Sequence, residues 1–401
     1  MKDNQAKYPQ LRFKGFTNPW EKRRLGERFA ERVDRSGDGE MLSVTIANGV
    51  VLANSLDRKD NSSSDKSNYK VVKKDDIAYN SMRMWQAASG VSKYDGIVSP
   101  AYTVLVPANG ESSTFFGYQF KQTEMKQIFQ RNSQGLTSDT WNLKYPLLSR
   151  IKTSAPERTE QIKIGEFLTK LDNLIAVNQR KLAKLKELKQ GYLQKMFPQN
   201  GSKFPQLRFA GFADAWEERK LGQYTKLITK GTTPKDKTGI GDVNFVKVEN
   251  ITNGKIYPIN KIKQHEHDNY LKRSRLEEKD ILFSIAGTLG RTAIVNKSIL
   301  PANTNQALAI IRGYDFDTNF LITSLAGNVV KEYIRRNPTV GAQPNLSLEQ
   351  VGNLLVNTPN AEEQQKIGSF FKQLDDTIAL HQRKLEKLQE LKKGYLQKMF
   401  C

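Results

Sequence analysis

The chain has 401 residues, a length that predicts two or three domains rather than one core. It carries 63 Lys and Arg against 42 Asp and Glu, a formal net charge of +21, so nucleic acid is the favoured class of partner. The single cysteine, Cys401, excludes a disulfide framework and a cysteine metal cluster. A polar N-terminus and the lack of an 18-residue apolar run argue against a signal peptide or a membrane span and predict a cytoplasmic protein.

The positive charge is spread over both halves of the chain. Residues 1–155 carry 24 basic and 16 acidic groups, and residues 198–360 carry 22 and 15. No basic tail accounts for the excess. An even excess on two folded halves predicts two similar surfaces that bind a polyanion, although solvated lysines alone would give the same totals.

The most informative feature is an internal repeat. The segment PQLRFKGFTNPWEKRRLG at 9–26 recurs as PQLRFAGFADAWEERKLG at 205–222, with 12 of 18 positions identical. A block of 38 residues at 160–197 recurs at 363–400, with 26 of 38 positions identical. The intervening regions share no obvious similarity. The predicted order is a repeat segment at 1–26, a variable domain at 20–155, a spacer helix at 156–197, a linker and repeat segment at 198–215, a variable domain at 216–359 and a spacer helix at 360–400.

The first variable domain alternates short apolar runs with Gly, Asn and Ser loops, a pattern typical of a mixed α/β fold. Its segment 73–107 combines basic, amide and aromatic side chains with Ser-rich loops. Arg and Asn read the edges of guanine and adenine, and Lys suits phosphates. The candidates for DNA contact in this segment, which also contains Trp85, are Tyr79, Asn80, Arg83, Lys93 and Tyr94.

The block at 160–197 predicts a long helix, because its apolar residues keep the heptad spacing of a coiled coil. These positions are Ile164, Leu168, Leu171, Ile175, Leu182, Leu185, Tyr192 and Met196, and their copies follow 203 residues later. Gly191 and Gly394 each cost about 1 kcal/mol in a helix interior. Their repetition predicts either a close backbone approach or an earlier helix end.

The second variable domain offers more polar loops than the first. A Thr/Lys/Gly loop at 230–254 leads into a strand, and a strand at 278–295 carries the turn GTLGR. Asp76-Ile77 and Asp280-Ile281 are expected to begin comparable strands in the two halves. The candidates for DNA contact here are Lys230, Thr232, Thr233, Lys235, Arg291, Asn303, Asn305, Gln306, Gln343 and Asn345.

Connectivity predicts how the helices pair. Because domain termini usually lie close together, the end of the first helix and the start of the second should meet at the second variable domain. The helices would then run antiparallel with one globular domain at each end, a nearly cyclic pseudo-two-fold architecture. Asn178 and His381 occupy equivalent heptad positions and would meet to set the register, unless both face solvent.

Motifs for catalysis are scarce. The sequence lacks a Walker phosphate loop, a strand-linked GxGxxG and a GxSxG. His265 and His267 form an H-E-H without a third metal ligand, so no metal site is expected, and a solvated loop is the favoured interpretation. The stretch Glu277-Glu278-Lys279-Asp280 contains the E-x-K of some nucleases without a convincing acidic partner. An autonomous DNA endonuclease and a coiled-coil adaptor that binds only protein therefore stay as alternatives to a DNA reader.

The chain resembles the specificity subunit of a type I restriction–modification system. The resemblance covers almost the whole chain and rests on the W-E-x-x-x-L-G segments at Trp20 and Trp216, the GTLGR turn at 287–291 and the repeated helix blocks. The GTLGR turn is missing from the first variable domain.

This resemblance implies that each variable domain is a target-recognition domain for one half of a bipartite site on double-stranded DNA. The antiparallel helices would fix the spacing between half-sites. Two methyltransferase (modification) subunits and two restriction subunits would dock on the chain. S-adenosylmethionine, ATP and magnesium would belong to those partners, so the resemblance implies no cofactor and no catalytic residue in this chain.

Overall fold

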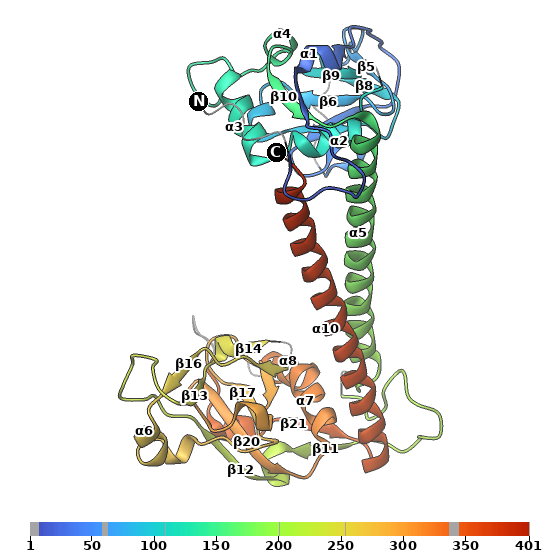
Figure 1. The fold of residues 1–401 in the computed structure, drawn as a ribbon. Coiled ribbons are helices and arrows are strands. Elements are labelled where there is room, and N and C mark those ends of the chain that lie inside the picture. The colour runs from blue at the N-terminus through green and yellow to red at the C-terminus, as the bar shows by residue number, and fades with distance from the viewer. Residues whose placement is uncertain are drawn as a thin grey trace. The chain divides into compact units, whose positions relative to one another are not determined.

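The computed structural model describes residues 8–57, 63–108, 110–199, 201–252, 254–336 and 345–400 (Figure 1). The chain forms two compact units. Unit 1 comprises Met1–Asn178 and Lys384–Cys401, and unit 2 comprises Gln179–Arg383. Each unit therefore contains one variable domain, the beginning of one long helix and the end of the other. Among the described helices, none is both long enough and apolar enough to span a lipid bilayer.

Unit 1 is built around a four-stranded antiparallel sheet in the order β2-β9-β6-β7. Its strands are β2 (Phe29–Glu31), β6 (Ile77–Asn80), β7 (Ser89–Val91) and β9 (Tyr102–Pro107). Three two-stranded sheets join β1 (Glu21–Arg24) to β10 (Lys152–Ala155), β3 (Leu42–Thr45) to β4 (Gly49–Leu52) and β5 (Lys70–Val72) to β8 (Gly96–Val98). The short helices are α1 (Leu25–Arg28), α2 (Ser113–Gln119), α3 (Thr123–Asn132) and α4 (Tyr145–Leu148).

Unit 2 repeats this plan with a sheet in the order β12-β20-β17-β18. Its strands are β12 (Thr225–Lys230), β17 (Ile281–Ser284), β18 (Thr292–Ile294) and β20 (Leu308–Tyr314). A second sheet contains β13 (Val243–Val246), β16 (Asn260–Ile262) and β19 (Ala302–Thr304), and two pairs join β11 (Glu217–Lys220) to β21 (Leu355–Thr358) and β14 (Ile251–Thr252) to β15 (Lys255–Ile256). The short helices are α6 (Gln264–Asp268), α7 (Thr318–Ala326), α8 (Asn328–Arg336) and α9 (Leu348–Gly352).

The two main sheets share one strand order and one register, although their sequences are unlike. Ile77 faces Leu105 across β6 and β9, and Ile281 faces Ile311 across β17 and β20. All four side chains are fully buried, and a residue adjacent to each one on its strand is buried on the opposite face in a second core cluster. The mixed α/β class is confirmed, and β6 and β17 do begin at equivalent positions.

The repeated blocks form the long helices α5 (Arg158–Lys195) and α10 (Ala361–Lys398). In unit 1 the ring of Phe167, near the start of α5, packs edge-on against Tyr395, near the end of α10, at 4.8 Å. In unit 2 Tyr192, near the end of α5, packs in the same way against Phe370, near the start of α10, at 5.0 Å. The beginning of one helix thus meets the end of the other, and the antiparallel pairing is confirmed within each unit.

The repeat segments hold the helix ends in both units. The Arg12 guanidinium forms a bidentate ion pair with the fully buried Glu160 of α5, and Leu11 N–H donates to the Lys398 carbonyl of α10 at 2.8 Å. In unit 2 Arg208 pairs in the same way with the buried Glu363 of α10, and Leu207 N–H donates to the Lys195 carbonyl of α5 at 2.8 Å. Each repeat segment therefore ties together one helix start and one helix end.

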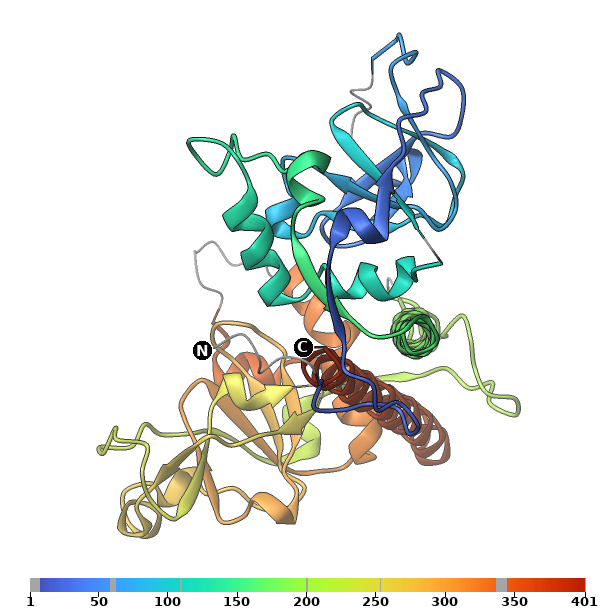
Figure 2. The same ribbon diagram turned by 45° about the horizontal axis from the view of Figure 1, so that its top comes forward.

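The repeated glycines of the helices fall into two classes. A Cβ added at Gly191 or Gly394 would meet nothing within 4 Å, and both helices continue past these positions. The prediction of a close approach or an earlier helix end is therefore wrong. Close approach occurs at Gly165 and Gly368, where α2 and α7 lie against α5 and α10 respectively (Figures 1 and 2).

The Gly368→Ala substitution should weaken unit 2. The new Cβ would lie 2.3 Å from Asp317 Oδ1 and 2.7 Å from the Phe320 backbone nitrogen, so α7 must move away from α10. Overpacking of this kind costs about 1–3 kcal/mol, against a gain of about 1 kcal/mol in helix propensity. Urea unfolding should report a net loss. The matched control Gly191→Ala has free space and should be stabilised, and a stable Gly368→Ala chain would contradict the close packing.

Candidate DNA interface

In each unit a hairpin links an inner strand of the main sheet to the neighbouring edge strand, β6 to β7 and β17 to β18, and an equivalent hydrogen bond closes it. Asn80 N–H donates to the Ala88 carbonyl at 2.9 Å, and Ser284 N–H donates to the Arg291 carbonyl at 2.8 Å. Each hairpin ends on a left-handed residue, Ala87 at φ 58° and Gly290 at φ 77°. The GTLGR turn of unit 2 thus has a structural counterpart in unit 1 that is built from different residues.

Most of the unit 2 candidates meet at the end of the sheet where this hairpin lies. Lys230 ends β12 opposite Ala309, and Thr232 N–H donates to the Thr304 carbonyl at 2.9 Å. The Thr233 hydroxyl donates to Gln306 Oε1. Arg291 and Asn345 join them, because the Arg291 N–H bonds to Ser284 Oγ and Asn345 bridges to Ala286. The members of this polar cluster are Lys230, Thr232, Thr233, Arg291, Asn305, Gln306 and Asn345.

The loop that follows Thr233 is held by a carboxylate on α6. Glu266 is buried, and its Oε1 accepts the backbone N–H groups of Lys235 at 2.7 Å and Asp236 at 3.3 Å. The Lys235 ammonium lies 4.6 Å from the centre of the Tyr270 ring. A hydrogen bond from Lys263 holds the pKa of Asp236 well below its usual range. The prediction that the H-E-H lies in a solvated loop is therefore wrong. The segment is part of α6, and its central residue Glu266 binds the loop at Lys235 and Asp236.

Two unit 2 candidates stand apart from the cluster. Asn303 is fully buried, and its amide group bonds to the Leu271 carbonyl, Ser274 Oγ and His267 Nδ1. The prediction that Asn303 contacts DNA is wrong, since its hydrogen-bonding capacity is used inside the core. Gln343 lies outside the described residues.

In unit 1 the equivalent end of the sheet carries Asn80 and Arg83. The Arg83 side chain is exposed, and Asn80 is partly exposed with its Oδ1 accepting the Met82 N–H at 3.0 Å. Trp85 follows and packs edge-on against Trp141 at 5.3 Å. The sequence pattern did not point to Trp141, because it lies more than fifty residues beyond the hairpin and only the fold brings it there.

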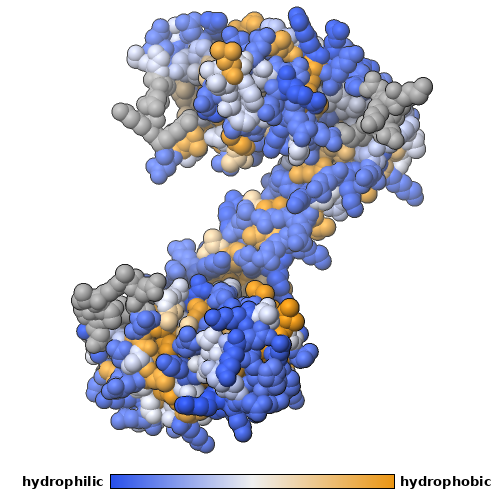
Figure 3. All heavy atoms as spheres, turned by 90° about the vertical axis from the view of Figure 1, so that its left-hand side faces the viewer, coloured by the Kyte–Doolittle hydropathy of each residue, from blue (hydrophilic) through white to orange (hydrophobic). Residues whose placement is uncertain are grey.

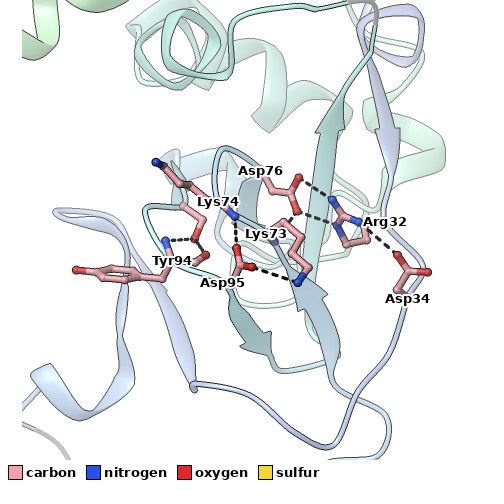
Figure 4. Close-up of polar contacts among 8 residues, drawn as sticks. Arg32, Asp34, Lys73, Lys74, Asp76, Tyr94 and Asp95 are labelled. Carbon is pink, nitrogen blue, oxygen red and sulfur yellow. Dashed lines mark hydrogen bonds and ion pairs between the residues drawn. The ribbon is translucent and has the colours of Figure 1, made fainter.

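Lys93 and Tyr94 lie at the opposite end of β6. They follow β7, whose Val91 faces Ile77, the first residue of β6. Both side chains are exposed, and the Tyr94 ring points away from the buried ion pair between Asp76 and Arg32 (Figure 4). The unit 1 candidates therefore form two groups, separated by the length of one strand.

Tyr79 belongs to neither group. Its side chain is fully buried in the core of unit 1, and burial strongly raises the pKa of its hydroxyl. The prediction that Tyr79 contacts DNA is wrong, because its ring packs in the same core cluster as Ile77, two residues earlier on β6.

The E-x-K stretch forms a structural turn. Asp280 is buried, and its carboxylate accepts both the Arg312 guanidinium and the Glu277 N–H. Asp76 makes the equivalent bonds to Arg32 and the Lys73 N–H in unit 1, where the corresponding stretch 73–76 has no E-x-K. Asp76 and Asp280 therefore stabilise the same turn in both units, and this structural role accounts for the buried Asp280 carboxylate without a nuclease site.

The two predicted register residues occupy different units. Asn178 is buried, and its amide donates to the Leu174 carbonyl on its own helix at 2.7 Å. His381 is partly exposed on α10. A role for this pair in helix register stays a prediction.

Much of the surface of each unit is polar. In the face shown in Figure 3, hydrophilic residues cover most of each unit and apolar residues form small patches. With a formal net charge of +21 for the chain, such surfaces suit a phosphate backbone. The contacts of individual candidates with DNA stay predictions.

Comparison with known proteins gives one consistent result. A family model described as the type I restriction modification DNA specificity domain matches residues 19–187 and 213–390. The MjaVIII specificity subunit of a type I restriction enzyme from Methanocaldococcus jannaschii is 22% identical over 69% of this chain and 67% of its own length. The putative MjaX specificity subunit of the same organism is 24% identical over 69% of this chain and 64% of its own length.

A solved structure shows the same fold. The crystal structure of a type I restriction–modification S subunit from M. genitalium aligns with 98% of this chain and 99% of its own. The TM-score is 0.61 at 15% sequence identity.

Proposed function

Because the chain belongs to the family of type I restriction–modification DNA specificity domains, we propose that it reads a bipartite target on double-stranded DNA. Each variable domain reads one half-site through the exposed polar residues at the hairpin end of its main sheet. The chain itself carries no catalytic residue and binds no cofactor. Methylation and cleavage are performed by partner subunits that supply S-adenosylmethionine, ATP and magnesium.

The observation that carries this proposal is the equivalence of the two hairpins. Asn80 and Arg83 in unit 1 and Arg291 in unit 2 lie on hairpins that join equivalent strands and are closed by equivalent hydrogen bonds. Hairpins at the same place with different loops and side chains suit two readers of different sequences, because side chains read base identity. Two DNA-binding domains on one chain also bind the whole site more tightly than either does alone. Once one domain has bound its half-site, binding of the other domain is intramolecular.

The repeated parts of the chain support two copies of one partner. The buried ion pairs of Arg12 with Glu160 and of Arg208 with Glu363 hold the helix ends in the same way in both units, so we expect the surfaces around these ends to be alike. We propose that one methyltransferase subunit docks at each of these surfaces and that two restriction subunits complete the complex.

Co-expression with the modification subunit, followed by methylation mapping of the host DNA, tests the function. The expected result is one bipartite methylated motif. Exchange of residues 27–153 for another such domain should change one half-site only, and exchange of 223–358 should change the other. Unchanged motifs after both exchanges would contradict the proposal, as would magnesium-dependent plasmid cleavage by the purified chain.

A further inference from the structure

Unit 2 contains a cavity of about 400 Å³ between α7 and the long helices. This volume falls in the range of sites for small ligands. The long helices contribute Lys189, Leu193 and Asp375 to its lining, α7 contributes Ile322 and Thr323, and the hairpin contributes Arg291. The lining thus combines apolar side chains with two cationic groups, Lys189 and Arg291, and the carboxylate of Asp375.

Unit 1 shows what occupies the corresponding space. The helices α2 and α7 are equivalent, since the N–H of Ser112 donates to Gln161 Oε1 at 2.9 Å and the N–H of Asp317 donates to Gln364 Oε1 at 3.0 Å. Counted from these residues, Tyr118 on α2 corresponds to Thr323 on α7. A large aromatic side chain in unit 1 is therefore replaced by a small one at the cavity of unit 2.

The ion pair that binds the tyrosine hydroxyl in unit 1 has a counterpart in unit 2. The Tyr118 hydroxyl donates to Asp172 Oδ2 at 2.7 Å, while Lys392 Nζ lies 2.5 Å from Asp172 Oδ1. In unit 2 Lys189 Nζ lies 2.6 Å from Asp375 Oδ1. No hydrogen bond within the described part of the chain reaches Asp375 Oδ2, the counterpart of the oxygen that accepts the tyrosine hydroxyl.

We propose that this cavity binds a phenol, an aromatic ring whose hydroxyl donates to Asp375 Oδ2 while its face lies against Ile322 and Leu193. Lys189 holds the carboxylate in place, as Lys392 does in unit 1. The ligand binds as the neutral phenol, because a phenolate would be repelled by Asp375. Burial raises the pKa of Tyr118 in the equivalent place, which keeps that hydroxyl protonated as well.

Binding of 4-methylphenol to the full chain tests this proposal, with NMR titration as the measurement. We expect one site in the wild-type chain and binding several-fold tighter than that of toluene, because toluene cannot donate a hydrogen bond to Asp375. Thr323→Tyr should fill the cavity and abolish binding. Asp375→Ala keeps the space but removes the acceptor, so 4-methylphenol should lose its advantage over toluene.

The internal copy provides a reciprocal test. Tyr118→Thr should open the equivalent cavity in unit 1 and raise the stoichiometry from one to two molecules of 4-methylphenol per chain. A stoichiometry that stays at one, or binding that survives Thr323→Tyr, would overturn the proposal.

A free phenol and a tyrosine of a docked polypeptide share this chemistry, and competition separates them. If the purified modification subunit displaces 4-methylphenol, the source is a partner tyrosine. If the modification subunit and 4-methylphenol bind to the chain at the same time, the natural ligand of the cavity is a free small molecule. The proposal does not depend on DNA recognition, since the titration uses neither DNA nor methylation.

Discussion

Replacement of Arg208 by alanine should strongly destabilise unit 2. Its guanidinium makes two hydrogen bonds to Glu363, whose side chain is 0% exposed. Removal of one partner of a buried pair leaves the other charge without compensation and costs about 3–5 kcal/mol. For a unit of this size the melting temperature should fall by on the order of 10 °C, which calorimetry would detect.

Two further variants isolate the cause. Lys372→Ala removes an exposed i,i+4 pair with Asp376 from the same helix and should change the free energy of unfolding by less than about 0.5 kcal/mol. Glu363→Gln in the Arg208→Ala background removes the buried charge and should recover part of the loss. Equal melting temperatures for Arg208→Ala and Lys372→Ala would show that the ion pair does not hold the helix end.

The repeat made the architecture of each unit predictable from sequence. Two nearly identical helix blocks with unlike domains between them leave few ways to close the chain, so the antiparallel pairing followed from connectivity alone. The heptad pattern also gave the buried helix face correctly at Ile164, Leu168 and Ile367. Long periodic segments carry this information because many positions must agree on one face.

The candidate site was less predictable, because burial at a strand end depends on tertiary structure. Tyr79 and Asn80 are neighbours in the sequence, yet Tyr79 is fully buried while Asn80, the last residue of β6, is partly exposed. Asn303 has its hydrogen-bond partners near 271–274, and a sequence scan does not connect these segments. The correspondence of the two hairpins was hidden because the loops 81–87 and 285–290 differ in length and sequence, and the left-handed residue that ends each is Ala87 in one and Gly290 in the other.

Lengthening both long helices should increase the distance between the two half-sites on DNA. The helix α5 begins in unit 1 and ends in unit 2, and α10 returns. Insertion of one heptad after Asn178 and another after Arg383 would preserve the phase of the apolar positions while lengthening each helix by about 10 Å. If the helices set the spacing, the methylated motif should keep both half-sites and gain a spacer longer by up to about three base pairs, since B-DNA rises about 3.4 Å per base pair.

Methylation mapping of the co-expressed complex would measure the spacer, and the design carries its own controls. A heptad in α5 alone places the helices out of register and should abolish methylation. Insertion of four residues in both helices rotates the apolar positions out of phase and should destabilise the chain. Altered half-sites with an unchanged spacer would refute the role of the helices as a ruler, because the inserted residues lie far in sequence from Asn80, Arg83 and Arg291 and should leave base contacts untouched.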